Sequence, residues 1–198
     1  MSNLKINYID NHDSFANTIA AYFRIAGADV EMYKSDCSLE TAVRGNPEMI
    51  LLGPGPNGPK TAGNYMELLD RYHGQIPFFG ICLGFQAMME YFGEPVIPLD
   101  EVVHGKAVEV YHKGEGIFEG IEQGQEFARY NSLGVYKVPD EFEITGKTEN
   151  GIVMAARHVE LPIQGVQFHP ESILSTTNKA GEMLVKNVVE MYERYKMI

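Results

Sequence analysis

Cysteine is scarce in this chain of 198 residues, which contains only Cys37 and Cys82. Two cysteines are too few for a disulfide framework, and the absence of a Cys-x-x-Cys pair argues against a structural zinc site. Proteins of reducing compartments typically use cysteine this sparingly. We therefore expect an intracellular protein that needs no metal and no cofactor.

Basic residues and long apolar runs are also in short supply. Lys and Arg number 16 against 27 Asp and Glu, so the formal net charge is -11. A diffusely acidic surface repels a phosphate backbone, which excludes nucleic acid as a favoured partner. No apolar run is long enough to span a bilayer, and the N-terminus lacks the apolar stretch of a signal peptide. These absences predict a cytoplasmic protein without membrane contact.

The first half of the sequence alternates between short apolar runs and amphipathic segments. Ser14 is a plausible N-cap for the first helix, and Gly27 and Gly93 are plausible helix stops. The pattern predicts strands at 4–10, 28–33, 49–52 and 76–79, and helices at 14–26, 39–44, 64–72 and 87–92. Alternation of this kind is typical of an α/β fold with a doubly wound, mostly parallel sheet and flanking helices.

The C-terminal half has a different texture, with several short strands and few helices between them. We expect strands at 96–98, 106–111, 125–129, 141–148, 152–157 and 163–168. A closing amphipathic helix at 178–195 is expected to bury Met183, Leu184, Val188, Met191 and Tyr195 on one face. With 44% hydrophobic residues and no linker, the chain is expected to form a single domain over residues 1–198.

The segment Gly80-Ile81-Cys82-Leu83-Gly84 joins a predicted buried strand to a predicted helix. Small residues two positions before and after a nucleophile permit a sharp strand-to-helix turn, because a Cβ there would clash. Such a turn exposes the sulfur at a helix N-terminus, which favours the thiolate. The alternative is that Cys82 is a buried small hydrophobe. The two flanking glycines favour the nucleophile.

A thiol nucleophile needs a base, and His169 is the best placed of the six histidines. It follows the apolar strand at 163–168 and lies in the segment His169-Pro170-Glu171. In an extended backbone, residues i and i+2 point to the same side, so Glu171 could orient the imidazole of His169. The alternative is an ordinary strand-end histidine beside a solvated carboxylate. With the cysteine turn in the same sheet, we favour a Cys82–His169–Glu171 triad.

Acyl transfer also needs hydrogen-bond donors for the developing oxyanion. The backbone amide of Leu83 follows the nucleophile, and the amide of Gly55 lies in the rigid Pro54-Gly55-Pro56 loop after the third strand. Gln86, one turn into the helix, faces the same opening and could bind a polar end of the substrate. Together these residues predict thiol-dependent hydrolysis of an amide or ester.

Several segments distributed along the chain carry a more specific pattern. They are Asp10–Phe15, Pro54–Pro56, Gly80–Gly84, His104–Lys106, Arg129–Leu133 and Gly165–Ser172. In these segments the sequence resembles the class I, or triad, glutamine amidotransferases. Within that family it is most similar to the glutaminase subunits, called component II, of anthranilate synthase and aminodeoxychorismate synthase.

The resemblance implies that Cys82 attacks the side-chain amide of glutamine and that His169 protonates the departing ammonia. It implies that Leu83 and Gly55 supply the oxyanion amides, and that Gln86, Ser132 and Leu133 hold the glutamine. It further implies a separate chorismate-binding synthase subunit, component I, as the partner that receives the ammonia. The pathway would be tryptophan biosynthesis, or alternatively folate biosynthesis, or both.

Three positions depart from the family pattern: Phe85 and Asn131 each stand where histidine is common, and Asn57 replaces a loop glycine. Two other functions stay open. One is a glutaminase subunit for another synthetase, such as one that makes a nucleotide, and the other is a non-catalytic regulatory subunit. The intact Cys82, His169 and Glu171 argue against the second.

Overall fold

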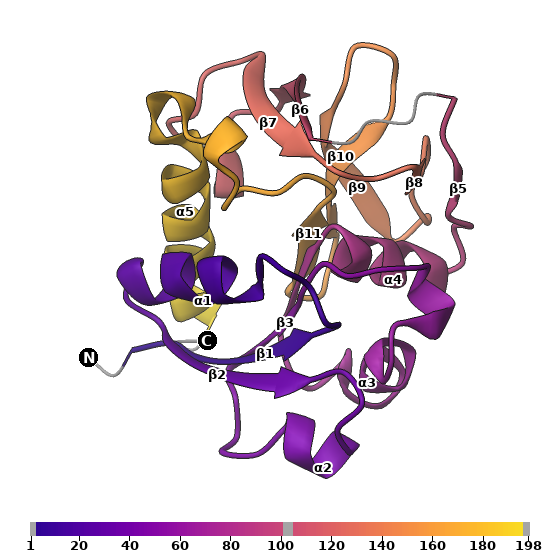
Figure 1. Ribbon diagram of the computed structural model, residues 1–198, viewed down its shortest axis with the longest axis vertical. Coiled ribbons are helices and arrows are strands. Elements are labelled where there is room, and N and C mark those ends of the chain that lie inside the picture. The colour runs from indigo at the N-terminus through magenta and orange to yellow at the C-terminus, as the bar shows by residue number, and fades with distance from the viewer. Residues whose placement is uncertain (1–2, 101–104, 196–198) are drawn as a thin grey trace.

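A nine-stranded sheet runs through the protein in the computed structural model, which describes residues 3–100 and 105–195 (Figure 1). The strand order is β2-β1-β3-β4-β11-β10-β9-β6-β7, and β5 and β8 form a separate two-stranded ladder. The strands are β1 (Lys5–Asp10), β2 (Asp29–Lys34), β3 (Met49–Leu52), β4 (Phe78–Ile81), β5 (Ile97–Pro98), β6 (Lys106–His112), β7 (Gln125–Arg129), β8 (Leu133–Gly134), β9 (Phe142–Lys147), β10 (Val153–His158) and β11 (Ile163–Val166).

Helices cover both faces of the parallel part of the sheet. They are α1 (Ala16–Ile25), α2 (Leu39–Ala42), α3 (Tyr65–Tyr72), α4 (Leu83–Tyr91) and α5 (Ala180–Tyr195), with short 3-10 turns at Pro59–Thr61, Gly116–Phe118, Ile173–Ser175 and Thr177–Lys179. One core cluster joins the sheet to α1 and α5, and a second joins it to α2, α3 and α4. Figure 1 shows α1 beside α5 on one side and α3 beside α4 on the other.

This layering explains why β3 and β4 are apolar at every position. All residues of both strands are buried, since each face meets helices rather than water. Strands β2, β1, β3, β4 and β11 pair in parallel, whereas β11, β10, β9, β6 and β7 pair antiparallel. The predicted doubly wound, mostly parallel fold with a β-rich C-terminal half is therefore confirmed.

The position of β11 matters most for function. It comes last among the strands in the sequence but lies between β4 and β10 in the sheet. Its register with β4 pairs Gly165 with Gly80 and Val166 with Ile81. Because the two strands are parallel, the residues that follow them leave the sheet at the same edge. The segments that contain Cys82 and His169 are therefore neighbours.

Several predicted boundaries were wrong for local reasons. Ser14 does not cap α1: the helix begins at Ala16, and Asp13 accepts the Phe15 N–H at 2.7 Å in a turn that precedes the helix. Strand β4 begins at Phe78 rather than residue 76, since Pro77 has no N–H to donate to the ladder. Helix α4 begins at Leu83, directly after Cys82, rather than at residue 87.

Two further expectations also failed. Tyr195 lies at the end of α5 with 42% of its surface exposed, so it does not belong to the buried face of that helix. The two-residue strand β8 was not expected, because its pairing with β5 depends on a contact between distant segments. Across the residues that the structure describes, no helix is long and apolar enough to cross a membrane.

Candidate active site

Cys82 lies in a strained turn between β4 and α4. Its φ of 52° and ψ of -102° fall in a region that residues with a Cβ rarely adopt. Backbone hydrogen bonds hold the turn in place: Cys82 N–H donates to Val166 O at 2.9 Å, and Gly84 N–H donates to Gly53 O at 3.1 Å. Both β11 and the loop after β3 therefore support the cysteine.

The glycines on either side of this turn are required by close backbone packing. A Cβ on Gly80 would lie 2.6 Å from Phe85 N, and one on Gly84 would lie 2.1 Å from Leu52 O. Neither neighbouring atom belongs to a flexible side chain, so neither can move away cheaply. The sharp strand-to-helix turn predicted from the Gly-x-Cys-x-Gly spacing is confirmed.

His169 and Glu171 form a buried pair beyond the end of β11. The distance from His169 Nδ1 to Glu171 Oε1 is 2.6 Å, and both side chains are at most 3% exposed. The i, i+2 relation expected from the sequence therefore brings the two side chains together. With Nδ1 bound to the carboxylate, Nε2 is the imidazole nitrogen left to face other groups.

The pKa of His169 reflects two opposing influences. Burial disfavours the charged imidazolium, but the Cys82 sulfur, followed by Glu171, outweighs burial and raises the pKa of His169 well above its usual range. The same contact includes a hydrogen bond between His169 and Cys82. The site therefore favours a thiolate–imidazolium pair, in which each charge stabilises the other.

Residues from distant segments enclose the imidazole of His169. Phe15 and Tyr130 pack edge-on against it, with ring centroids 5.8 Å and 5.0 Å away. Tyr130 also hydrogen-bonds Ser172 at 3.0 Å. The sequence motifs around residues 10–15 and 129–133 thus meet at the histidine. Phe15 and Tyr130 fix the ring between two aromatic walls.

A buried serine that the sequence did not single out holds the backbone of His169. Ser175 is fully buried, and its hydroxyl donates to His169 O at 2.6 Å while accepting from Ala128 N–H at 2.8 Å. Its only sequence signal was its position six residues after the histidine. It acts as a bridge between β7 and the segment that carries the triad.

The structure also places the residues predicted to contact the substrate. Gln86 is buried on α4 and donates from Nε2 to Leu133 O at 2.9 Å, which joins the helix to β8. Leu133 is half-buried and Ser132 is exposed, so these residues border the site from the antiparallel half. Leu83 is the first residue of α4 and directly follows the cysteine.

Gly55 lies in the loop after β3, the same loop whose Gly53 carbonyl supports the cysteine turn. A Cβ on Gly55 would lie 2.5 Å from Asn11 O, so the loop packs directly on the segment after β1. The side chain of Asn11 donates to Pro56 O at 3.4 Å and accepts from Ser35 at 2.6 Å. This packing fixes the path of the loop next to the cysteine turn.

The three departures from the family pattern each have a structural explanation. Phe85 is fully buried and packs in the core under α4, so an apolar residue suits that position. Asn57 has a φ of 68°, and asparagine is among the non-glycine residues that best tolerate this conformation. Asn131 is buried and donates to Leu133 O at 2.6 Å. His104, from another motif, lies outside the described residues.

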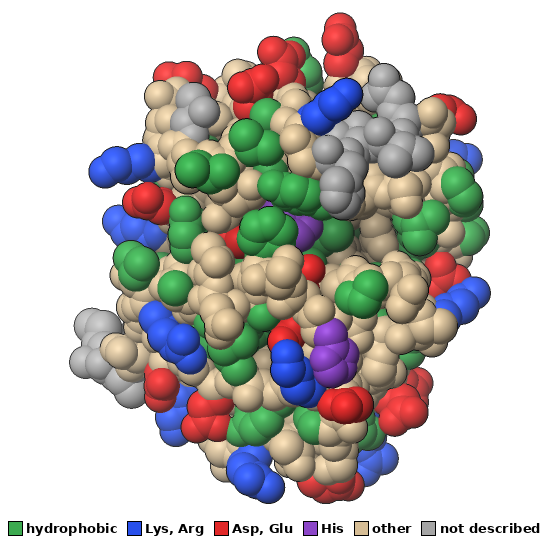
Figure 2. All heavy atoms as spheres, viewed as in Figure 1, with side chains coloured by type: hydrophobic (Ala, Val, Ile, Leu, Met, Phe, Trp, Pro, Cys, Tyr) green, Lys and Arg blue, Asp and Glu red, His purple; other side chains and the backbone are tan. Residues whose placement is uncertain are grey.

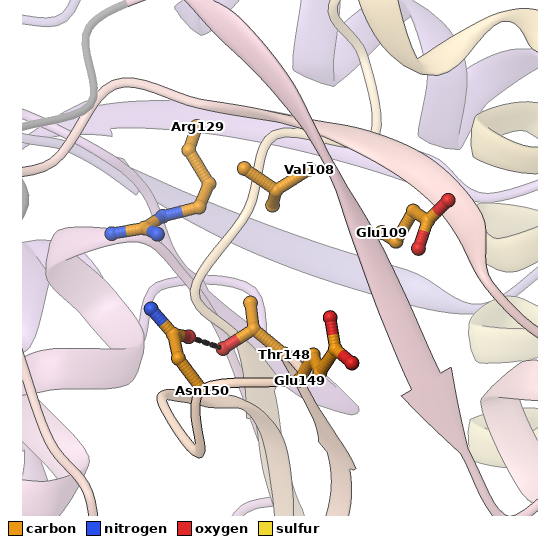
Figure 3. A pocket seen from close by; sticks show the side chains of 6 residues that line it. All are labelled: Val108, Glu109, Arg129, Thr148, Glu149 and Asn150. Carbon is orange, nitrogen blue, oxygen red and sulfur yellow. Dashed lines mark hydrogen bonds between the residues drawn. The ribbon is translucent and has the colours of Figure 1, made fainter.

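A cavity of about 500 Å³ lies away from this site, beside β6 and β7 (Figure 3). Its lining residues are Val108, Glu109, Arg129, Thr148, Glu149 and Asn150. None of the predicted site residues is among them, so this cavity is separate from the cysteine. In residues 3–100 and 105–195, no cluster of three or more His, Cys, Asp or Glu side chains could hold a metal ion.

Comparison with known proteins gives a consistent result. A family model described as glutamine amidotransferase class-I matches residues 7–191. Anthranilate synthase component 2 of Haemophilus influenzae is 41% identical over 189 residues, which cover 93% of this chain and 96% of that protein. The aminodeoxychorismate/anthranilate synthase component 2 of Bacillus subtilis is 38% identical over 189 residues, which cover 94% and 96%.

A solved structure shares the fold. It is a putative GMP synthase protein of Thermoplasma acidophilum, which superimposes with a TM-score of 0.87 and covers 100% of this chain and 98% of its own. Its sequence identity is 22%, so this match supports the architecture alone.

Proposed function

This chain belongs to the class-I glutamine amidotransferase family, and from that premise we propose that it is a glutaminase subunit. It hydrolyses glutamine to glutamate and ammonia, with Cys82 as nucleophile, His169 as acid and base, and Glu171 as the group that orients His169. The observation that carries the proposal is the convergence of Cys82, His169 and Glu171 at the adjacent ends of β4 and β11.

The reaction follows from the thiolate–imidazolium pair. The Cys82 sulfur attacks the side-chain amide carbon of glutamine, and the amides of Leu83 and Gly55 stabilise the oxyanion. His169 gives the proton on Nε2 to the departing nitrogen, so that ammonia leaves and a glutamyl thioester remains. His169 then takes a proton from water, which attacks the thioester and releases glutamate. Gln86 and the backbone at Ser132 and Leu133 hold the substrate.

The ammonia is passed to a chorismate-binding synthase subunit on a separate chain. This part of the proposal is supported by the relatives named anthranilate synthase component 2, which match this chain over nearly their full length. The product would be anthranilate, for tryptophan biosynthesis. A relative named for both aminodeoxychorismate and anthranilate synthesis favours, as a second possibility, a subunit shared with folate biosynthesis.

The whole chain is proposed to act as one amidotransferase domain. The family model covers residues 7–191, and the continuous sheet takes strands from both halves of the sequence. Cutting the chain between β4 and β11 would therefore separate the nucleophile from its base.

The direct test measures glutamate release by the purified chain, first alone and then with chorismate and a chorismate-binding synthase subunit. We expect release that rises strongly with the partner, together with an aromatic amine whose identity names the pathway. A Cys82→Ser variant that still released glutamate at the original rate would contradict the mechanism. Unchanged release on addition of every such synthase would contradict the partner.

Exposed apolar residues near the triad are candidates for the partner-binding surface. Ile173, four residues after His169, is 82% exposed, and Leu174 is 38% exposed. Figure 2 shows hydrophobic side chains gathered across the middle of one face, with charged side chains mostly around the rim. A partner that receives ammonia would cover the surface next to the site that releases it.

A matched pair of variants tests this surface. Ile25, at the end of α1, is 81% exposed and so serves as a control for Ile173. We expect Ile173→Glu to reduce stimulation by the synthase partner while Ile25→Glu leaves it unchanged. Equal stimulation of both variants would move the partner to another face.

A further inference from the structure

A buried glutamine that was not singled out by the sequence lies against the reactive sulfur. Gln167 follows β11 and has no exposed surface. Its Nε2 lies 3.7 Å from Cys82 Sγ, within hydrogen-bond range for sulfur, and its Oε1 lies 3.1 Å from Gln86 Nε2. The two glutamine side chains thus form a continuous link from the sulfur to the backbone of β8.

The direction of this link is set by its far end. Leu133 O is a carbonyl oxygen and can only accept, so the atom of Gln86 at 2.9 Å from it must be the donating Nε2. Since that nitrogen also lies against Gln167, the atom of Gln167 that it meets must be the accepting Oε1. The remaining atom of Gln167, which faces the sulfur, is then Nε2 and can only donate.

Asn131 strengthens this assignment. It donates to the same Leu133 carbonyl at 2.6 Å, and it is itself held by Arg129, whose Nε donates to Asn131 Oδ1 at 3.2 Å. A guanidinium can only donate, so the orientation of the Asn131 amide is fixed in the same way. The carbonyl therefore receives two donors and cannot exchange roles with Gln86.

We propose that Gln167 is a catalytic residue that donates a hydrogen bond to the Cys82 thiolate, and that the Leu133 carbonyl fixes its polarity through Gln86. An N–H donor stabilises a thiolate more than a thiol, since hydrogen bonds to charged acceptors are the stronger ones. The sulfur then has two donors, Gln167 on one side and His169 on the other. The proposal rests on the proposed role of Cys82 as the nucleophile.

The test compares two glutamines of the same segment. Gln164 is also buried, lies on β11, and donates to a sulfur that takes no part in the reaction, Met191 Sδ, at 3.0 Å. Gln167→Met and Gln164→Met remove an N–H donor of the same kind at each place. The intact proteins are alkylated with iodoacetamide, and modification of the Cys82 peptide is followed by mass spectrometry.

We expect Gln167→Met to slow Cys82 alkylation about tenfold at about pH 7, the effect of losing one hydrogen bond to a charged group. At about pH 10, where a cysteine is ionised without help, the rates should converge. Gln164→Met should follow the original protein at both pH values. A wild-type rate for Gln167→Met near pH 7 would overturn the proposal. Equal slowing in both variants, or slowing at both pH values, would also overturn it by indicating a packing effect.

A second measurement does not depend on the stability of the Gln167 variant. The side-chain amide resonances of Gln167 and Gln164 are compared by NMR in the original protein and in Cys82→Ala. Only the Gln167 resonance should move when its acceptor is removed, and an unchanged Gln167 resonance would refute the contact. Neither measurement uses glutamine. A chain with these signatures but no glutaminase activity would contradict the proposed function and leave the role of Gln167 intact.

Discussion

The ends of β4 and β11 lie side by side, yet they hold their functional residues by opposite means. Cys82 at the end of β4 has a strained backbone, which is permitted by glycines and held by main-chain hydrogen bonds. His169 at the end of β11 is held mainly by side chains: Glu171, Ser175 and two aromatic rings. The first end is built by the backbone and the second by packing.

The difference follows from what each group must do. A nucleophile must be open to the substrate, so side chains cannot enclose it and the backbone must aim it. A base must keep one tautomer and one orientation, which requires directional contacts around the ring. If this comparison is right, substitutions at the two ends should separate stability from activity in different ways.

The largest effect is expected from Cys82→Gly. Glutamate release should fall by about 10⁴-fold or more, because no nucleophile remains. The fold should become more stable by about 1 kcal/mol, since glycine adopts a positive φ without strain. Urea unfolding and a glutaminase assay measure the two effects. A loss of stability would show that the cysteine turn is not strained.

Next in size is Glu171→Gln, which keeps the shape of the side chain but removes its charge. We expect a decrease in kcat/KM of about 10³-fold, as for an orienting carboxylate in a triad. Glu171 helps to raise the pKa of His169, so the variant should lose its imidazolium at a lower pH. Since the imidazolium protonates the departing ammonia, the defect should grow toward alkaline pH. A constant defect across the pH profile would contradict this role.

Gly84→Ala should act on the fold more than on the chemistry. A Cβ there would meet the Leu52 carbonyl at 2.1 Å, and we expect a destabilisation of about 3 kcal/mol or more. Gly74→Ala is the matched control, because its Cβ would meet nothing within 4 Å. Thermal unfolding of both variants measures the effect. Similar melting temperatures would show that the backbone of the turn can relax.

The smallest effect is expected from Ser175→Ala. It leaves the Ala128 N–H and the His169 carbonyl without the hydroxyl they share, which should cost about 1–3 kcal/mol of stability. A decrease in kcat with little change in KM should accompany it, because the histidine backbone loosens while the substrate pocket stays intact. Ser175→Thr keeps the hydroxyl and should restore kcat if its extra methyl fits. An unchanged kcat in Ser175→Ala would show that the side chains of the triad hold His169 without help.

The sequence by itself determined the features that depend on local rules. The Gly-x-Cys-x-Gly spacing predicts the turn, since close backbone packing excludes a Cβ at both glycines. The His169-Pro170-Glu171 segment predicts the buried pair, since alternate residues of an extended chain share a side. The alternation of apolar strands and helices predicts the doubly wound sheet for the same kind of reason.

Only the tertiary structure decided which distant segments meet. It inserted β11 beside β4, brought Phe15 and Tyr130 to the histidine, and directed Gln167 at the sulfur. None of these contacts leaves a periodic signal, because each joins residues far apart in the sequence through side-chain shape and hydrogen-bond direction. The polarity of the Gln86–Gln167 link depends on one carbonyl in β8, a strand that exists only because β5 lies next to it.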